Sequence, residues 1–436
     1  MESITGHDVA NANAREAALR LWNPGPGVTP VPLWLDCDTG HDDAFAILLA
    51  ACSPAACLLG VSTVHGNASL DDTTKNTCSV LRAIGRPDVP VFPGAVKPLC
   101  RDPVHAESIH GASGLDGTTL LPDPGEIPPM GDNLAVNAMY TALKDTPPQT
   151  AWLITTGTLT NAALFFAMYP SMIEHLAGLS IMGGVVGGFF THAPLGKLSE
   201  RVELSEKLHK EFPTWLSGDS VMTTEELGAH FRGLGLLKDQ GVADDKLFNV
   251  LDKAKESFGN WSPYAEFNIF CDPEAAASIF TIPKLAAKTT LIPLDVTHQV
   301  LANRTVLDLL RFGYEGDKGK TTGLRILFQE ICTFFAGTYD REFGMDTGPP
   351  LHDPIAVAAA IVPEIFDDLD GERFAVHVVR EGDAHVEQCG RTIVKRAPKG
   401  QPGVRIPRTL HIPEFWHMID LSLAVAEKRS PCVLPS

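Results

Sequence analysis

Short, continuously apolar runs recur along the chain, and turn residues and a helix-like pattern follow most of them. The runs are VPLWLD (31–36), CLLGVSTV (57–64), AWLITT (151–156), LSIMGGVV (179–186) and TTLIPLDV (289–296). Continuous apolar character is typical of parallel strands that are buried on both faces. The first helical pattern, DDAFAILLAAC (42–52), places Ala44, Ile47, Leu48 and Cys52 on one face. This alternation predicts a doubly wound α/β fold, with a mostly parallel central sheet flanked by helices.

Two stretches depart from this rhythm. Residues 190–258 are charged and mostly helix-like, which predicts an insertion. Residues 372–411 alternate with a period near two in RFAVHVV, RTIVKR and RTLHIP, which predicts a small C-terminal antiparallel appendage, and PEFWHMIDLSLAVAEK predicts a closing helix. We therefore predict a peripheral leader at residues 1–30 and a single domain at 31–436, with a helical insertion at about 190–258.

Composition narrows the classes of partner and compartment. The 436 residues are 44% hydrophobic and 20% charged, which is typical of a globular chain. A formal net charge of -18 argues against nucleic-acid and anionic-membrane partners, because phosphates would be repelled. The nine cysteines are scattered and form no CxxC pair, and no window has the length and apolarity of a membrane span. We expect a cytoplasmic protein without structural zinc.

The stretch WLDCDTGHDDAFAILLA (34–50) crowds Asp36, Asp38, Asp42 and Asp43 at the end of the first predicted strand. Acids in the first turn of a helix are common and need no ligand. Asp36 and Asp38, however, face the same turn, where Gly40 permits tight chain reversal, and converging carboxylates repel one another unless a cation or proton intervenes. Hard oxygen ligands favour Ca²⁺ or Mg²⁺. A metal site and a solvated turn are the two interpretations of this stretch.

An Asp-x-Asp after a strand also begins the haloacid-dehalogenase-type phosphatases, in which the first aspartate is a nucleophile. That reaction would need a following Gly-Thr and distant Lys and acidic partners. The order DCDTGHDD does not supply the Gly-Thr, so the sequence favours this alternative less.

The same stretch resembles the inosine–uridine-preferring nucleoside hydrolases, whose hallmark is D-x-D-x-G-x-D-D. Further segments follow in the family order: VHGNASLDDTTKNT with Asn67, IHGASGLDG with His110, TTGTLTNAA with Thr156, IMGG with Met182, GNWSPYAEFNIFCDPEAA with Asn260, Glu266 and Asn268, and LHDPIAVAAA with His352 and Asp353. The resemblance extends from about residue 31 to the C-terminal region, apart from the insertion. Thr39 replaces the proline usual after the second aspartate, which leaves every carboxylate in place.

The resemblance implies a Ca²⁺ site and a ribose site. The implied metal ligands are the carboxylates of Asp38, Asp43 and Asp353 and the backbone carbonyl of Thr156. The implied ribose contacts are Asp42 at a hydroxyl, Asn268 at the 3-hydroxyl side, Asn260 and Glu266 at the 5-hydroxymethyl group, Met182 beside the sugar, and Asn67, which also positions the water. Asp36 receives no role.

The implied reaction is hydrolysis of an N-glycosidic bond through an oxocarbenium-like transition state. Asp38 is the expected general base for the attacking water. His352 is expected to protonate or hydrogen-bond the leaving base, with His110 as a second candidate. Phe335, Tyr339 and Phe343 lie on one helical face, which is typical of core, but their position matches the family helix that stacks on the base, so Tyr339 is an expected base contact.

The sequence thus predicts a Ca²⁺-dependent ribonucleoside hydrolase of nucleoside salvage. Uridine and inosine are the leading substrates, and related ribosides such as nicotinamide riboside are further candidates. A hydrolase restricted to purine nucleosides is the alternative within this class. A catalytically silent nucleoside or ribose binder is the alternative from another class; the intact Asp38 argues against it. Members of this family are often dimers or tetramers, so the resemblance implies a homo-oligomer of one of these sizes.

Overall fold

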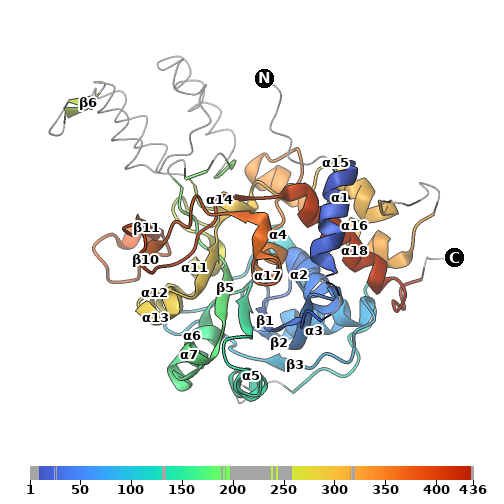
Figure 1. Cartoon of the computed structure of the whole chain (residues 1–436), viewed down its shortest axis with the longest axis horizontal. Helices are drawn as coiled ribbons and strands as arrows, with labels where there is room; N and C mark the ends of the chain where they lie inside the picture. The colour runs from blue at the N-terminus through green and yellow to red at the C-terminus, as the bar shows by residue number, and fades with distance from the viewer. Residues whose placement is uncertain are drawn as a thin grey trace.

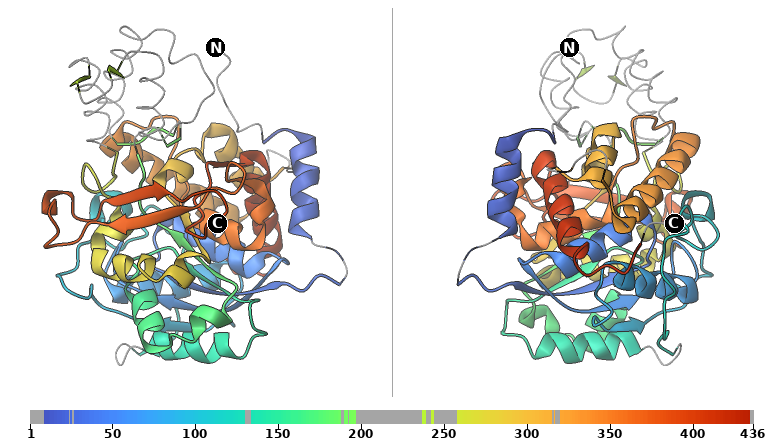
Figure 2. Two further views of the ribbon diagram at one scale, coloured as in Figure 1. Left: turned by 60° about the vertical axis from the view of Figure 1, so that its left-hand side comes forward. Right: turned by 90° about the vertical axis from the view of Figure 1, so that its right-hand side faces the viewer.

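A computed structural model of the chain is shown in Figures 1 and 2. It describes residues 9–129 apart from 24 and 26, 134–196 apart from 188, 189 and 192, 258–433 apart from 315 and 317–319, and two short strands, β6 (Leu237–Lys238) and β7 (Val242–Ala243). These two strands pair in antiparallel fashion. Most of the predicted helical insertion at 190–258 therefore lies outside the described residues.

The centre of the molecule is a six-stranded sheet in the order β3-β2-β1-β4-β5-β8, with every neighbouring pair parallel. Its strands are β1 (Val31–Cys37), β2 (Ala56–Thr63), β3 (Val91–Pro93), β4 (Trp152–Thr155), β5 (Gly178–Met182) and β8 (Thr289–Ile292). The doubly wound prediction is confirmed. Because the chain order reverses on either side of β1, the carboxyl ends of β1, β2 and β4 form the crevice where such sheets bind ligands.

Helices cover both faces of this sheet, as the alternation predicted. One face carries α2 (His41–Cys52), α3 (Leu70–Ala83), α15 (Arg304–Phe312), α16 (Gly323–Phe343), α17 (Asp353–Ile361) and α18 (Ile412–Ala426); the other carries α5 (Leu134–Lys144), α6 (Thr160–Met168), α7 (Met172–His175), α12 (Pro273–Phe280) and α13 (Pro283–Ala286). Strand β1 sends Leu33, Leu35 and Cys37 to the first face and Trp34 to the second. No helix among the described residues is long and apolar enough to cross a membrane.

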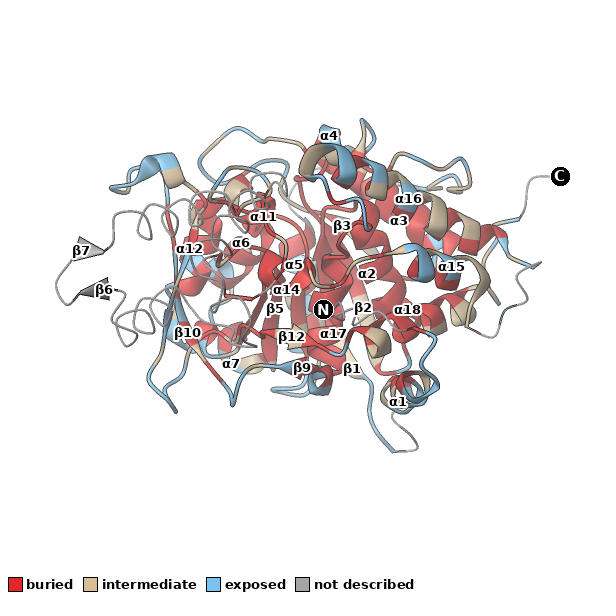
Figure 3. Cartoon of the chain, turned by 90° about the horizontal axis from the view of Figure 1, so that it is seen from above, coloured by how far each residue is buried: buried red, intermediate tan, exposed pale blue. Residues whose placement is uncertain are grey.

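Helix α2 is buried on all sides, although its sequence pattern predicted a single apolar face. All twelve of its residues are buried, and so are all nine of α17 (Figure 3). The reason is that α17 and α18 both pack against α2 and cover the side that would otherwise meet solvent. Because α2 is buried, the carboxylates of Asp42 and Asp43 at its start are shielded from water.

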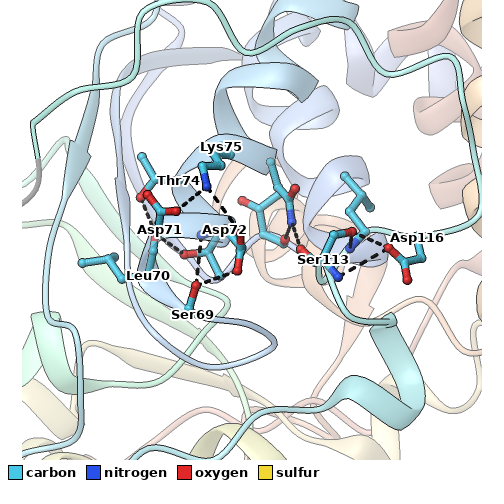
Figure 4. Close-up of polar contacts among 12 residues, drawn as sticks. Ser69, Leu70, Asp71, Asp72, Thr74, Lys75, Ser113 and Asp116 are labelled. Atoms are coloured by element: carbon cyan, nitrogen blue, oxygen red, sulfur yellow. Dashed lines mark hydrogen bonds and ion pairs between the residues drawn. The ribbon is translucent and has the colours of Figure 1, made fainter.

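Short elements complete the rim of the crevice: α4 (Glu107–His110), α11 (Phe267–Cys271) and α14 (Leu294–Thr297). Helix α3 begins after Ser69, whose Oγ accepts a hydrogen bond from the backbone N–H of Asp72 at 3.2 Å (Figure 4). Such a cap satisfies one of the free N–H groups at a helix start. The loop between β2 and α3 is thereby fixed beside the crevice.

The predicted C-terminal appendage is present, with one difference. Strands β10 (Phe374–Val378) and β11 (Thr392–Arg396) pair in antiparallel fashion. The third predicted segment instead forms β12 (Thr409–Leu410), which pairs with β9 (Phe366–Asp367). Prolines at 398, 402 and 407 lack the N–H that a continuing ladder needs. Among the described residues, this segment meets β10 through one bridge, between Phe374 and Val404.

Helix α1 (Ala12–Trp22) lies within the predicted leader and packs along α18 (Figure 2). Its buried residues are Ala14, Ala18 and Trp22. The guanidinium of Arg15 lies 3.0 Å from the carboxylate of Asp420 in α18. An ion pair and an apolar stripe therefore hold this helix on the domain.

Candidate active site

Three buried carboxylates meet at the carboxyl end of β1. Asp42 and Asp43 open α2, Asp353 opens α17, and one oxygen of each lies within 4.8 Å of the others. Burial is the main cause that raises the pKa of Asp42 to about 7 and that of Asp43 to about 6, and it also raises the pKa of Asp353. Asp42 and Asp353 share a hydrogen bond, which requires a proton on one of them. In a set of oxygen donors of this kind, a hard divalent cation would take the place of the protons.

Asp38 lies next to this cluster, at the end of β1, and is held by the loop after β2. The backbone N–H of Asn67 donates to Asp38 Oδ2 at 2.8 Å, and Asn67 Nδ2 donates to Asp38 Oδ1 and Asp43 Oδ2 at 3.3 Å each. Gly66 permits this approach, because a Cβ there would lie 1.9 Å from Asp38 Oδ2. Burial, followed by repulsion from Asp43, raises the pKa of Asp38, which makes its carboxylate a stronger base.

Thr156 joins the acid cluster to the opposite wall. Its hydroxyl donates to Asp43 Oδ1 at 2.7 Å, and its carbonyl oxygen accepts from Asn268 Nδ2 at 2.8 Å. Asn268 Nδ2 also approaches the carbonyl oxygen of Met182 at 3.4 Å. One amide thus brings the ends of β4 and β5 together with α11.

Glu266 is the N-cap of α11 and is buried. Its carboxylate accepts hydrogen bonds from the backbone N–H groups of Asn268 (2.8 Å), Ile269 (3.0 Å) and Gly184 (2.8 Å). Asn260 Oδ1 accepts from the backbone N–H of Phe267 at 3.0 Å. These two residues therefore hold the loop before α11 in place at the pocket wall.

Aromatic side chains of α16 form the other end of the site. Phe335 packs on Tyr339 and Tyr339 on Phe343, with ring centroids 4.7 Å and 5.0 Å apart. The Tyr339 hydroxyl lies 2.7 Å from His352 Nε2, and the Thr297 hydroxyl lies 2.7 Å from His352 Nδ1. Burial lowers the pKa of His352, which keeps the imidazole neutral.

His110 lies on this aromatic side, in contact with a second buried histidine. His110 Nδ1 is 3.1 Å from His41 Nδ1, and His41 Nε2 is 2.8 Å from the carbonyl oxygen of Asp116. The Asp116 carboxylate closes its own loop by accepting from the backbone N–H groups of Ala112 (3.0 Å) and Ser113 (3.4 Å) (Figure 4). The loop that carries His110 is therefore fixed to the start of α2.

Gly40 is needed here for space rather than for an unusual backbone angle. Its φ of -109° is open to any residue. A Cβ at this position, however, would lie 2.6 Å from His110 Nδ1 and 2.8 Å from Asn67 Nδ2. Glycine thus allows both side chains to lie over the start of α2.

These groups line one pocket, whose open space, including its mouth, is ≈ 480 Å³. It is lined by every predicted site residue except Asp38 and Asp43, which lie behind its acidic end. Sequence reasoning missed His41, Thr297 and the half-buried pocket residue Ile109. It also missed Trp261, which is 37% exposed at the pocket. None of the described lining residues is Lys or Arg.

Asp36 does not line the pocket. It accepts hydrogen bonds from the Ser62 hydroxyl of β2 and from Asn161 Nδ2 of α6, the latter at 2.8 Å. Asn161 Nδ2 also donates to the carbonyl oxygen of Thr63 at 3.0 Å. Burial raises the pKa of Asp36 to about 7. This fourth aspartate ties the ends of β1 and β2 to α6.

Comparisons with known proteins agree with this arrangement. The model of the family described as inosine-uridine preferring nucleoside hydrolase matches residues 33–417. A uridine nucleosidase of Saccharomyces cerevisiae is 31% identical over 92% of this chain and 98% of its own. A pyrimidine-specific ribonucleoside hydrolase of Klebsiella pneumoniae is 31% identical over 78% of this chain and 82% of its own.

Solved structures share the fold. A purine-preferring ribonucleoside hydrolase from Gardnerella vaginalis superposes with a TM-score of 0.65 at 22% identity, covering 91% of this chain and 99% of that one. A plant nucleoside hydrolase superposes with a TM-score of 0.63 at 22% identity, over the same shares of the two chains.

Proposed function

Because the chain belongs to the inosine-uridine preferring nucleoside hydrolase family and is a nucleoside N-ribohydrolase, we propose that it cleaves uridine or inosine to ribose and free base with Ca²⁺ bound at the acid cluster. The observation that carries the proposal is the buried set Asp42, Asp43 and Asp353 at the acidic end of a pocket that has no Lys or Arg among its described lining residues. Such a set is matched to a cation and to a neutral sugar that becomes positive in the transition state.

Asp38, Asp43, Asp353 and the carbonyl oxygen of Thr156 would hold the cation. A bound calcium ion would orient the water and the ribose hydroxyls together, and it would lower the pKa of that water modestly. Asp42, Asn67 and Asn268 would bind the ribose hydroxyls, and Asn260 and Glu266 would bind the 5-hydroxymethyl group beside Met182.

The attacking water loses its proton to Asp38 as its oxygen forms a bond to the anomeric carbon. The bond between that carbon and the base nitrogen breaks, and its electron pair leaves with the base. Two neutral groups, His352 and the Tyr339 hydroxyl, lie 2.7 Å apart at the aromatic end and would hydrogen-bond or protonate the departing base. Water exclusion by Phe335 and Phe343 would strengthen these bonds.

Ribose release tests the proposal. The full-length protein is incubated with uridine, inosine, adenosine and nicotinamide riboside, with added CaCl₂ or with a chelator. We expect ribose from uridine or inosine in calcium and little with the chelator. Binding of a nucleoside without ribose release would identify a silent binder, and no ribose from any substrate would overturn the proposed reaction.

We also propose a homo-oligomer in a reducing, cytoplasmic compartment, with a role in nucleoside salvage. All nine cysteines are free, which supports the compartment. Analytical ultracentrifugation tests the assembly; a monomer at micromolar concentration would contradict it.

A further inference from the structure

The contact between His41 and His110 has no counterpart in the roles proposed above. His41 is 1% exposed, and its ring stacks on Phe334 and Phe335 with centroids 5.1 Å and 5.5 Å away. Its side chain does not line the pocket. We infer that His41 is a positioning residue that keeps the proton of His110 on Nδ1, so that His110 Nε2 presents a lone pair to an N–H group of the nucleobase.

Three contacts decide where the protons lie. A carbonyl oxygen only accepts, so the 2.8 Å contact between His41 Nε2 and the Asp116 carbonyl places the His41 proton on Nε2. In a neutral ring, His41 Nδ1 then carries a lone pair. His110 Nδ1, 3.1 Å away, must donate to it, or two lone pairs would face each other.

The competing contact is longer. The backbone N–H of His41 also points at His110 Nδ1, at 3.4 Å. Accepting that bond would place the His110 proton on Nε2 and leave the 3.1 Å ring contact repulsive. The proton arrangement that satisfies the two shorter contacts is therefore the stable one.

Burial supports neutral rings. His41 is 1% exposed and His110 is 6% exposed, and an imidazole that is removed from water is more stable in its uncharged form. His352 differs, because both of its partners are hydroxyls that donate or accept equally well, so its own proton is free to change sides. The two histidines of the pocket thus have different roles: His110 accepts a hydrogen bond from the base, and His352 hydrogen-bonds or protonates the leaving base.

The place of His110 identifies what its lone pair meets. Its ring packs on Phe335 at 5.4 Å, on the aromatic side of the pocket, and no described protein group bonds to its Nε2. This inference rests on the proposed function, in which the aromatic side holds the base. A base that offers an N–H, such as the ring of uridine with its single N–H at N3, satisfies this acceptor.

Nitrogen NMR of histidine-labelled, full-length protein tests the proton positions without any substrate. The His110 signals are assigned as those that disappear in His110→Gln. We expect the Nδ1 signal to have the chemical shift of a protonated ring nitrogen and the Nε2 signal that of an unprotonated one. In His41→Phe, which retains the stacked ring, only the backbone N–H of residue 41 faces Nδ1, so the proton should move to Nε2. In His41→Asn, whose amide oxygen can accept at the same place, the original arrangement should return.

A His110 that is protonated at Nε2 in the unaltered protein would overturn the inference, and so would identical His110 signals in His41→Phe. If His41→Phe does not fold, the His110 signals of the unaltered protein and of His41→Asn still test the inference.

Kinetics give the second measurement. We compare kcat/KM for uridine and 3-methyluridine, because methylation removes the only N–H of the ring. The extra bulk of the methyl group affects all variants alike, so the change in the ratio reports on His110. His41→Phe should reduce the preference for uridine about tenfold, and His41→Asn should retain it. An unchanged ratio in His41→Phe overturns the inference, whereas no ribose from uridine, inosine or any other nucleoside tested with the unaltered protein overturns the proposed function and leaves the NMR result standing.

Discussion

Asp38 differs from the other carboxylates of the site in its partners. Asp42, Asp43 and Asp353 face one another, whereas both oxygens of Asp38 accept from Asn67. An amide oxygen can accept from the Asn67 backbone N–H as a carboxylate does. The charge of Asp38 can therefore be removed while the hydrogen bond from the Asn67 backbone N–H is kept.

We expect Asp38→Asn to lower kcat for ribose release by about 10²-fold or more, because an amide cannot take the proton of the water. Thermal unfolding should change little. Steady-state kinetics on uridine or inosine measures the effect, with the exposed Asp102→Asn as the control. A variant that keeps full activity would remove Asp38 from the role of base.

Gly40→Ala tests the close approach over the start of α2. The added methyl would collide with His110 Nδ1 and Asn67 Nδ2, and so we expect kcat/KM to fall about tenfold or more. Gly337→Ala is the matched control, since a Cβ there meets nothing within 4 Å and alanine favours the helix. That control should keep its activity and melt slightly higher. Equal activity of the two variants would contradict the packing argument.

At the scale of elements, a buried network joins α1, α16 and α18. The Asp420 carboxylate lies 3.0 Å from Arg15 and 3.0 Å from Arg325, and Arg325 also reaches Glu427 at 3.0 Å. Arg325 further donates to the carbonyl oxygens that end α15. One carboxylate thus fixes two helices, and α16 carries the aromatic end of the pocket.

Removing that carboxylate leaves two guanidinium groups with little access to water. We expect Asp420→Ala to reduce the free energy of unfolding by about 3 kcal/mol. Denaturant unfolding measures this loss. Glu16→Ala, which removes a largely exposed ion pair with Arg20 on α1, should stay close to the unaltered protein. Similar losses in both variants would show that the buried network contributes no more than a surface pair.

The elements also show which features a sequence can predict. The long apolar runs became β1, β2, β4, β5 and β8, because burial on both faces leaves a continuous pattern. β3 has three residues, too few for a pattern, and the pairing of β12 depends on prolines whose effect is felt only in the folded sheet. The apolar face predicted for α2 is buried, but the burial of its other side could not be predicted, because distant helices cover it.

The site divides in the same way. Residues in contiguous motifs, such as Asn67, Asn268 and Asp353, could be predicted because their segments are recognisable one by one. His41 could not, since its role depends on a carbonyl oxygen in the loop at Asp116. The sequence shows only that His41 lies between Gly40 and Asp42, and this position does not predict a contact with the loop at Asp116.

At the scale of the whole molecule, the acid cluster makes stability depend on pH and on metal. Asp42 and Asp43 have pKa values raised from 3.8 to about 7 and about 6, so between pH 4 and 7 the native state binds more protons than the unfolded state. Their contribution to the free energy of unfolding therefore falls as pH rises. Buried histidines act oppositely: burial lowers the pKa values of His41 and His65 from 6.5 to about 4, so their contribution rises with pH.

A comparison with Asp42→Asn separates the two groups, because the histidines are common to both proteins. In chelator at pH 7.5, this variant should melt about 3 °C or more above the unaltered protein, since one buried like charge is gone, and the gap should close near pH 4.5. Added CaCl₂ should raise the Tm of the unaltered protein strongly at pH 7.5 and weakly at pH 4.5, because a cation binds the deprotonated carboxylates. Differential scanning calorimetry at fixed ionic strength measures both effects. A gap that is equal at the two pH values would mean that the carboxylates do not interact as charges, and a calcium effect independent of pH would mean that the ion binds elsewhere.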